Sequence, residues 1–249
     1  MKALITGASG GIGMELALLL KDKYDTLVLV ARTKEKLLNL KNEIEKDSKT
    51  KVEIEPLDIS IKENCINLFE KHKDVDFLIN NAGFGDIGFF DETSLDKEIS
   101  MINTNIVAYH ILTKLYLKEM KSKNSGHILN VASIAGFMPG PLMSTYYATK
   151  SYVLRLSEGI RTELKKSKSK VKISVLCPGP VSTGFEKAAN ISFNFHGTDV
   201  KYVAKYTMKH INRFYIIPRF SVKLGRFLIK ILPSNFVSKF IYKFQSGRK

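Results

Sequence analysis

Cysteine is scarce in this sequence. The 249 residues include two cysteines, Cys65 and Cys177, which lie far apart in the chain. Two such cysteines cannot form a disulfide framework, and neither has the close cysteine partner that a zinc site uses. The five histidines also show no metal-ligand spacing. These absences argue against a disulfide-stapled secreted domain and against a metal site, and they make a reducing cytoplasm the expected location.

Long apolar runs are missing as well. No stretch approaches the roughly 20 apolar residues that a membrane-spanning helix needs. The first apolar stretch, residues 3–5, runs directly into a glycine-rich turn, so we do not expect a secretory signal peptide. The hydrophobic share of 44% is enough for one sizeable core, and the length predicts one α/β domain over residues 1–249.

Acidic residues are nearly absent from the last part of the chain. Residues 1–184 carry 26 Lys and Arg against 22 Asp and Glu, whereas residues 185–249 carry 13 against 2. Most of the net charge of +15 therefore belongs to the C-terminal part, which needs its own explanation. Nucleic acid is not the expected partner, because no recognisable nucleic-acid module accompanies the charge.

Short β-type runs alternate with longer amphipathic helical patterns along the chain. The predicted strands are Ala3–Thr6, Thr26–Ala31, Lys51–Leu57, Val75–Ile79, His127–Val131, Lys172–Cys177 and Phe214–Ile217. This rhythm predicts a single doubly wound parallel sheet of about seven strands with helices on both faces. Such a sheet binds its ligand at the carboxyl ends of the strands. We expect a core in residues 1–184, a substrate loop and the last strand in residues 185–220, and basic amphipathic helices in residues 221–249.

A glycine-rich turn, Thr6–Gly13, follows the first predicted strand and opens the first helix. Glycine tolerates a tight turn and lets the backbone approach a phosphate, while the helix N-terminus offers free N–H groups. The spacing is G-x-x-x-G-x-G rather than the common G-x-G-x-x-G fingerprint. We therefore predict a pyrophosphate site, with a glycine turn that binds no ligand as the alternative. The residues expected to form it are Gly7, Ser9, Gly11, Ile12 and Gly13.

The end of the second strand bears on the choice of cofactor. An NAD site usually has a carboxylate here for the ribose hydroxyls, whereas an NADP site uses an Arg for the 2′-phosphate. Arg32 stands at this point without a nearby acid, so it predicts NADP(H), with NAD(H) as the less favoured cofactor. The alternative is an exposed Arg without a phosphate partner. Further cofactor contacts are expected after the third and fourth strands, at Asp58, Ile59, Asn81, Ala82 and Gly83.

A Ser, a Tyr and a Lys in one short stretch suggest proton transfer. Tyr146 and Lys150 are four residues apart on a predicted helix and so share a face. Tyrosine has an ordinary pKa near ~10, and a nearby ammonium would lower that pKa toward neutrality. Ser133, at the end of the fifth strand, could hydrogen-bond a substrate oxygen as charge develops. Spacing alone leaves Tyr147 as an alternative to Tyr146. An isolated Tyr/Lys pair at this spacing is usually a pair of surface residues without a catalytic role.

These segments, in this order, resemble a short-chain dehydrogenase/reductase of the common form of about this length. The matching segments are Thr6–Gly13, Asn80–Gly83, Asn105, Ser133, Tyr146–Lys150 and Pro178–Thr183. The resemblance covers residues 1 to about 184. It implies a Rossmann-type fold and an oxidoreductase that interconverts a carbonyl and a secondary alcohol. It also implies a homo-oligomer.

The resemblance also assigns roles within the site. It makes Tyr146, rather than Tyr147, the acid–base, and it adds a contact of Lys150 with the nicotinamide ribose. Asn105 would hold a helix bend and a water of a proton relay. Four residues would contact the nicotinamide end of the cofactor: Pro178, Gly179, Val181 and Thr183. Of these, Thr183 would meet the carboxamide, and Val181 would make its contact through the backbone. Gly10 stands where many NADP-using relatives carry a basic residue, which leaves Arg32 as the main phosphate ligand.

Aromatic and other apolar residues gather in the predicted loops at the ligand edge. They are Phe84, Phe89, Phe90, Phe137, Met138, Phe185, Phe193 and Phe195. They favour an apolar or lipid-like substrate, although aromatics also build cores. A different class of function remains open, namely a non-catalytic NADP-binding sensor or a membrane-surface scaffold. A basic adaptor for acidic partners is a third.

Two amphipathic segments end the chain. The first has an apolar stripe of Leu224, Phe227, Leu228 and Ile231 opposite Lys223, Arg226 and Lys230. The second, after Pro233, has Phe236, Val237, Phe240, Ile241 and Phe244 opposite Lys239 and Lys243. Basic helices with an apolar face are typical of association with an anionic membrane surface. The same faces could instead pack on the core, line a substrate entrance or meet another subunit.

Overall fold

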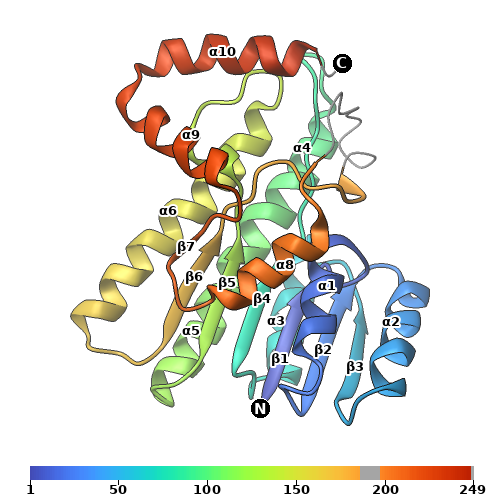
Figure 1. Ribbon diagram of the computed structural model, residues 1–249. Coiled ribbons are helices and arrows are strands. Elements are labelled where there is room, and N and C mark those ends of the chain that lie inside the picture. Colours follow the sequence, from blue (N-terminus) through green and yellow to red (C-terminus); the bar gives the residue numbers. More distant parts are fainter. Residues whose placement is uncertain (186–196, 248–249) are drawn as a thin grey trace.

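The computed structural model of the chain describes residues 1–185 and 197–247. Within them, seven parallel strands form one sheet in the order β3-β2-β1-β4-β5-β6-β7 (Figure 1). The strands are β1 (Lys2–Thr6), β2 (Thr26–Ala31), β3 (Lys51–Pro56), β4 (Phe77–Asn80), β5 (His127–Val131), β6 (Lys172–Leu176) and β7 (Tyr215–Ile216). The predicted strands and fold class are confirmed. The last strand is shorter than predicted, because only Tyr215 and Ile216 pair with β6.

The helices connect and cover these strands. They are α1 (Gly11–Leu20), α2 (Lys34–Lys46), α3 (Lys62–Lys71), α4 (Leu95–Ile102), α5 (Ala108–Ser122), α6 (Ser144–Lys166), α8 (Val200–Lys209), α9 (Phe220–Ile231) and α10 (Ser234–Ser246). A π-helical turn, η1 (Asn103–Val107), joins α4 to α5, and a 3-10 turn, η2 (Ile134–Phe137), follows β5.

The strands are apolar on both faces because helices cover the sheet on both sides (Figure 1). Successive side chains of a strand point to opposite faces, so Leu4 of β1 packs in one core and Ile5 in the other. The first core lies between the sheet and α3, α5 and α6, and it buries Tyr116 completely. The second lies against α1, α2 and α8 and includes Leu16 and Leu37. The alternating pattern of the sequence had predicted this doubly wound arrangement.

The strand order reverses next to β1, which pairs with β2 on one side and β4 on the other. The loops after β1 and β4 therefore leave the sheet side by side at its carboxyl edge. Ligands of doubly wound sheets bind at such a reversal. The fold thus brings residues 7–13 and residues 81–83 together at the position where a ligand is expected.

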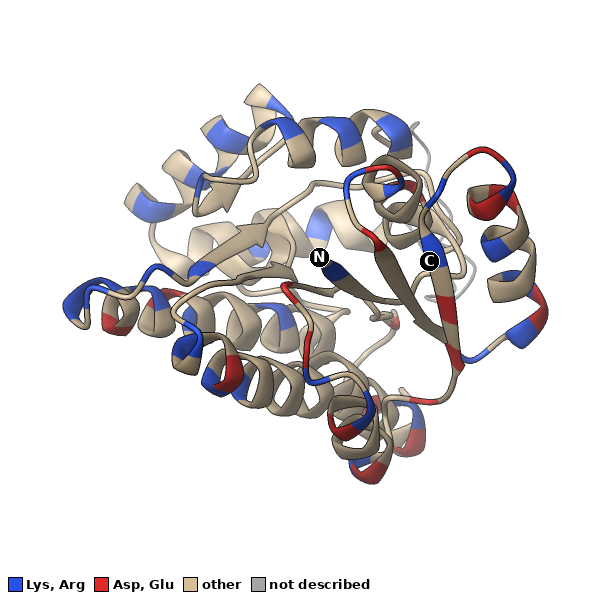
Figure 2. Ribbon diagram, turned by 90° about the horizontal axis from the view of Figure 1, so that it is seen from below, with Lys and Arg blue, Asp and Glu red and all other residues tan. Residues whose placement is uncertain are grey.

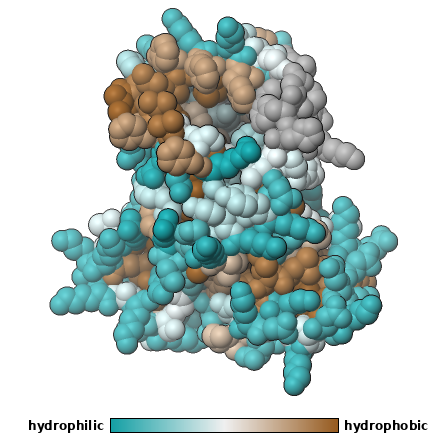
Figure 3. Space-filling view, viewed as in Figure 1, coloured by the Kyte–Doolittle hydropathy of each residue, from teal (hydrophilic) through white to brown (hydrophobic). Residues whose placement is uncertain are grey.

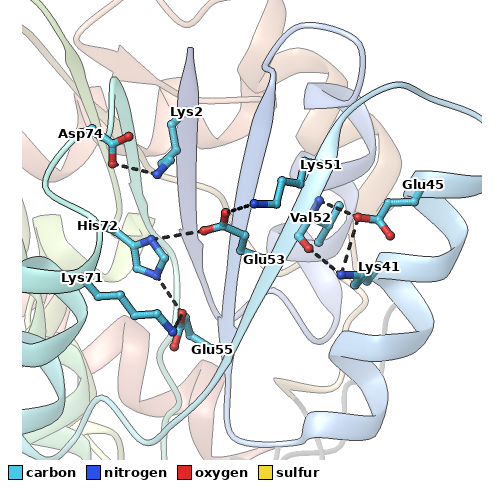
Figure 4. A network of polar contacts seen from close by, with 10 residues as sticks. All are labelled: Lys2, Lys41, Glu45, Lys51, Val52, Glu53, Glu55, Lys71, His72 and Asp74. Atoms are coloured by element: carbon cyan, nitrogen blue, oxygen red, sulfur yellow. Dashed lines mark hydrogen bonds and ion pairs between the residues drawn. The ribbon is translucent and has the colours of Figure 1, made fainter.

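Charged side chains form a network of polar contacts along the outer strand β3 (Figure 4). One edge of this strand pairs with no other strand of the sheet, and such an edge otherwise offers unpaired backbone groups to other chains. His72, buried at the end of α3, lies with Nε2 2.8 Å from Glu55 Oε1 and with Nδ1 3.6 Å from Glu53 Oε2. Lys51 and Lys71 pair with the same two carboxylates at 2.8 and 2.7 Å. This network joins the end of α3 to β3 at the edge of the sheet, and its residues do not line the cavity described below.

The two C-terminal helices lie above the carboxyl ends of the strands, with α10 running across the top of the view in Figure 1. The inner side of α10 buries Val237 and Ile241 against Met143 and Tyr147, near the start of α6. No helix among the described residues is both long and apolar enough to cross a membrane.

One residue of α9 lies differently from the sequence expectation. Arg226, predicted to lie on the polar face, instead stacks its guanidinium on the rings of Tyr215 and Phe137, at 3.7 and 4.8 Å from their centroids. The predicted apolar stripe, Leu224, Phe227, Leu228 and Ile231, is exposed. A guanidinium stacks readily on aromatic faces, and the rings that Arg226 meets come from β7 and η2, which no local pattern reveals.

Candidate active site

A cavity of about 620 Å³ opens at the carboxyl ends of the strands. Its walls combine the glycine turn after β1, the ends of β2 to β6, the first turns of α6, and one side of α10. All the predicted cofactor residues except Gly13 line it. The predicted catalytic residues Ser133, Tyr146 and Lys150 line it as well.

The glycine turn is packed tightly against the loop after β4. Gly7 and Gly11 have φ values of +67° and +57°, which glycine adopts without strain. A Cβ on Gly7 would lie 2.8 Å from Ala82 Cα, and one on Gly13 would lie 2.4 Å from the Gly7 carbonyl oxygen. Asn81 Nδ2 donates to the carbonyl oxygens of residues 6 and 7 at 3.0 and 3.2 Å. Gly13 therefore shapes the turn from behind rather than facing the cavity.

The first turn of α1 faces the cavity through Gly11 and Ile12. The preceding residue, Gly10, has no side chain with which to cap the helix. The first-turn N–H groups and the positive end of the helix dipole are thus offered to whatever occupies the cavity. This backbone cradle fits the pyrophosphate of a dinucleotide.

Two basic side chains lie at the far end of the cavity from Tyr146. Arg32 Nη1 is 3.9 Å from Asp58 Oδ2, and the Arg32 side chain is 74% exposed. Lys36, in the first turn of α2, lines the same end together with Thr33. The sequence interpretation missed Lys36. Its position four residues after Arg32, where a helix begins, was the available signal.

Ser133, Tyr146 and Lys150 converge from two elements. Ser133 follows β5, and its hydroxyl accepts a hydrogen bond from the Ala135 N–H at 3.2 Å. Tyr146 and Lys150 project from the same side of α6. The Lys150 ammonium donates to the Val131 carbonyl at 3.0 Å and lies 5.9 Å from the centroid of the Tyr146 ring. A substrate oxygen in the cavity could therefore meet a hydroxyl, a phenol and, behind them, an ammonium.

Burial governs the ionisation of this pair. It raises the pKa of the Tyr146 phenol, and a hydrogen bond from the Ser133 hydroxyl opposes that rise. Burial lowers the pKa of Lys150 to about 8. The net shift of the Tyr146 pKa is therefore upward, opposite to the lowering expected from a nearby ammonium, because desolvation of the phenol dominates. At neutral pH Tyr146 keeps its proton and can act as an acid.

Tyr147 lines the cavity beside Tyr146, with the two rings 6.0 Å apart in a T-shaped contact. The two hydroxyls have different partners, however. Tyr147 Oη accepts a hydrogen bond from Gln245 Nε2 of α10 at 2.8 Å, whereas Tyr146 is paired with Ser133. Tyr147 is thus connected to the C-terminal helix and Tyr146 to the rest of the polar cluster.

Asn105 lies in the π-helical turn η1 and is completely buried behind the cavity wall. Its Oδ1 accepts from the Phe84 N–H at 3.2 Å, and its Nδ2 donates to the Phe84 carbonyl at 2.9 Å and to Thr149 Oγ1 at 3.0 Å. A Cβ on Gly83 would lie 2.9 Å from Asn105 Oδ1 and 3.3 Å from Lys150 Nζ. Asn105 and Lys150 thus both lie close to Gly83, on the side where a Cβ would stand.

The loop after β6 closes the opposite wall. Pro178, Gly179, Val181 and Thr183 line the cavity there. Thr183 faces the glycine turn, because a Cβ on Gly11 would lie 3.3 Å from its side chain. The turn and this loop therefore flank the same space.

The apolar residues predicted at the ligand edge divide into four groups. Phe84, Met138 and Phe185 line the cavity, and the Phe185 ring lies 5.3 Å from the Tyr146 ring. Phe89 and Phe90 are exposed, and Phe137 packs under Arg226 instead. Phe193 and Phe195 belong to residues 186–196, which lie outside the described residues, as does most of the predicted substrate loop.

Ile241, Phe244 and Gln245 of α10 also line the cavity, next to Met143 and Tyr147. The sequence interpretation did not place them in the site, although it named a substrate entrance as one use of the apolar faces. They lie about 100 residues after Tyr146 in the chain, and no local pattern indicates which side of α10 turns inward.

Comparison with known proteins places this site in a context. A family model described as "short chain dehydrogenase" matches residues 1–192, which end before α8. An uncharacterized oxidoreductase of Staphylococcus aureus (strain MW2) is 34% identical over 194 residues, covering 76% of this chain and 82% of the relative.

Solved structures agree with that match. A short-chain dehydrogenase from Sphingobium yanoikuyae in complex with NADPH is similar with a TM-score of 0.85 and 27% identity, and the match covers 92% of each chain. A short chain dehydrogenase/reductase from Burkholderia phymatum in complex with NAD is similar with a TM-score of 0.79 and 25% identity, covering 90% of this chain and 91% of that one.

Proposed function

The chain belongs to the short-chain dehydrogenase/reductase family, and from this we propose that it is an NADP(H)-dependent oxidoreductase interconverting a carbonyl and a secondary alcohol. Membership of the family makes it a dehydrogenase or reductase acting on CH–OH or carbonyl groups. One observation supports the proposal above others: Ser133, Tyr146 and Lys150 line the same cavity as the glycine turn that fits a pyrophosphate.

A bound nicotinamide cofactor would supply or accept the hydride, and the chain would handle the proton. In the reductive direction the Ser133 hydroxyl donates a hydrogen bond to the substrate oxygen as negative charge develops on it. The Tyr146 phenol, which keeps its proton at neutral pH, donates that proton to the oxygen. The Lys150 ammonium stabilises the phenolate that remains. Lys150 and Asn105 then belong to the path that returns a proton to Tyr146, and oxidation uses the same groups in reverse.

The preference for NADP(H) is supported by the basic end of the cavity. Arg32 and Lys36 offer two positive charges where the 2′-phosphate of NADP would lie, against the single carboxylate of Asp58. One solved relative holds NADPH and another holds NAD, so the relatives support a nicotinamide cofactor without choosing between the two.

An apolar substrate is supported by the side chains between Tyr146 and the C-terminal helix. Met138, Met143, Phe185, Ile241 and Phe244 line that part of the cavity. A carbonyl compound with a bulky apolar body would remove them from water. A cytoplasmic protein, assembled as a homo-oligomer, remains our proposal, and peripheral contact with an anionic membrane surface would suit such a substrate.

The test is a panel of ketones and aldehydes of increasing apolar size, followed by the loss of NADPH absorbance. We expect turnover that favours the larger apolar members. A protein that binds NADPH tightly but reduces no member, and oxidises none of the matching alcohols, would instead be a non-catalytic NADP-binding sensor or scaffold.

A further inference from the structure

The outer side of α9 and α10 exposes large apolar side chains. Phe220, Phe227, Ile231, Phe236 and Phe240 are between 59% and 77% exposed. Figure 3 shows a brown, hydrophobic area over α9 and the adjoining part of α10, at the upper left of the view. Soluble monomers rarely leave a contiguous apolar area of this kind open to water, so the area marks a contact with something else.

The fold has already used the other side of these helices. Val237, Ile241 and Gln245, spaced one turn apart on α10, are buried against the protein. On α9, Arg226 and Ile229 face inward, toward η2 and α10. Other residues of α9 and α10 already occupy the positions that face the protein. The exposed side chains are therefore not part of the protein's own core.

The charge around this area identifies the partner. Lys223, Lys230, Lys239 and Lys243 are exposed on the same two helices, and residues 220–247 contain no Asp or Glu. Figure 2 shows basic and acidic residues mixed along most other elements. A second copy of this surface would bring like charges together. An anionic bilayer offers both an apolar interior for the Phe and Ile side chains and phosphates for the Lys ammonium groups.

The same helix also forms a wall of the catalytic cavity. Ile241, Phe244 and Gln245 line the cavity, and Phe244 is also 41% exposed, so it lies at the opening. Gln245 is hydrogen-bonded to Tyr147, the neighbour of Tyr146. The exposed apolar area and the opening of the cavity thus meet on α10.

We propose that the outer side of α9 and α10 docks on an anionic lipid bilayer and that the cavity takes its apolar substrate from that bilayer past Phe244. The docking stands on the exposure and charge of the two helices alone. The delivery of substrate rests on the proposed oxidoreductase function as well.

Vesicle flotation of the full chain tests the docking. Phosphatidylcholine vesicles with and without phosphatidylglycerol are compared at low and high salt. We expect binding to the anionic vesicles at low salt, weakened by salt, and little binding to the neutral ones. Two triple variants, Phe227→Gln/Phe236→Gln/Phe240→Gln and Lys230→Glu/Lys239→Glu/Lys243→Glu, should each reduce the partition coefficient by ~10-fold or more.

The matched control is Lys46→Glu/Lys165→Glu/Lys166→Glu, which makes the same charge change at exposed positions away from the two helices. It should retain binding within about twofold if docking is local. Equal losses in the control and the tail variants would overturn the docking. So would absence of vesicle binding together with a dimer that the Phe variant dissociates, which would make the area an interface between copies.

Activity tests the delivery of substrate. A long-chain methyl ketone carried in anionic vesicles is compared with cyclohexanone in free solution, using NADPH. The Phe variant should lose turnover of the vesicle-borne ketone by ~10-fold while it keeps turnover of any soluble one, because its substitutions lie outside the cavity. Equal losses on both ketones, or none on the vesicle-borne one, would overturn the delivery. Vesicle binding without turnover of any carbonyl would leave the docking standing and refute the proposed function.

Discussion

At the scale of single residues, burial decides what Tyr146 and Lys150 can do. Burial raises the pKa of the phenol and lowers the pKa of the ammonium, so both shifts favour the neutral forms. The Lys150 ammonium faces the Val131 carbonyl, the rings of Tyr109 and Tyr146, and the thiol of Cys177. Carboxylates are not among these neighbours within the described residues, so holding a positive charge here costs stability.

The pKa of Lys150 predicts a pH dependence of stability. The folded pKa is about 8, below its ordinary value of 10.5, so the unfolded chain binds more protons between these two values. Stability contributed by this group should therefore rise with pH from about 8 toward 10.5, on the order of 1 kcal/mol per pH unit. Urea unfolding of wild type and Lys150→Met between pH 7 and about 9.5 measures it. A difference between the two that stays flat over this range would contradict the prediction.

Arg32 should determine the choice of cofactor. Arg32→Asp removes a charge-assisted contact to the 2′-phosphate and adds repulsion, so NADPH binding should weaken by about 2–4 kcal/mol while NADH binding changes much less. Calorimetry with both cofactors measures this. Lys34→Asp is the matched control, because Lys34 is exposed nearby but does not line the cavity. Equal affinity of the wild type for NADH and NADPH would refute the assignment.

The residues that spacing predicted and those it missed differ in a physical way. Ser133, Tyr146 and Lys150 lie close together in the sequence. The end of one strand and one helix are therefore enough to bring them together at the cavity. The direction of the Tyr146 pKa shift could not be predicted in the same way, because it depends on burial by distant elements. Gln245 was missed for the same reason.

At the scale of elements, the glycine turn and α1 are held by close backbone contacts. Gly13→Ala would place a Cβ 2.4 Å from the Gly7 carbonyl oxygen, which forces the turn apart. We expect a loss of about 1–3 kcal/mol of stability and weaker NADPH binding. Gly10→Ala is the control, since a Cβ there has open space and the backbone is extended at φ 173°. Thermal unfolding and calorimetry of the two variants check this, and equal effects would be evidence against the packing described.

At the scale of elements, the strands were predicted well because their sequence pattern indicates burial on both faces of the sheet. The runs that became β1 to β6 are apolar throughout because helices cover both faces of the sheet. The orientation of α9 was not predicted, because its apolar stripe is the more hydrophobic side and yet faces outward. Stacking of Arg226 on Tyr215 and Phe137 gives the opposite side its contact with the protein.

At the scale of the whole molecule, two parts of the chain form the walls of the cavity. The family model covers β1 to β6, the glycine turn and the Ser, Tyr and Lys residues, whereas α8, β7, α9 and α10 lie beyond its match. The first part of the sequence therefore predicts the reaction class. The substrate depends on the last part, from which the sequence does not predict it. The far wall of the cavity comes from α10, whose outer side carries the exposed apolar and basic residues.

The central claim is that Tyr146 transfers the proton of a carbonyl reduction supported by NADPH. Its most direct test is the turnover of Tyr146→Phe with the best ketone of the panel, measured beside Tyr147→Phe, with NADPH binding followed by fluorescence. We predict that Tyr146→Phe loses turnover by ~10²-fold or more and still binds NADPH, while Tyr147→Phe loses much less. Equal losses in the two variants, or a larger loss in Tyr147→Phe, would contradict the account.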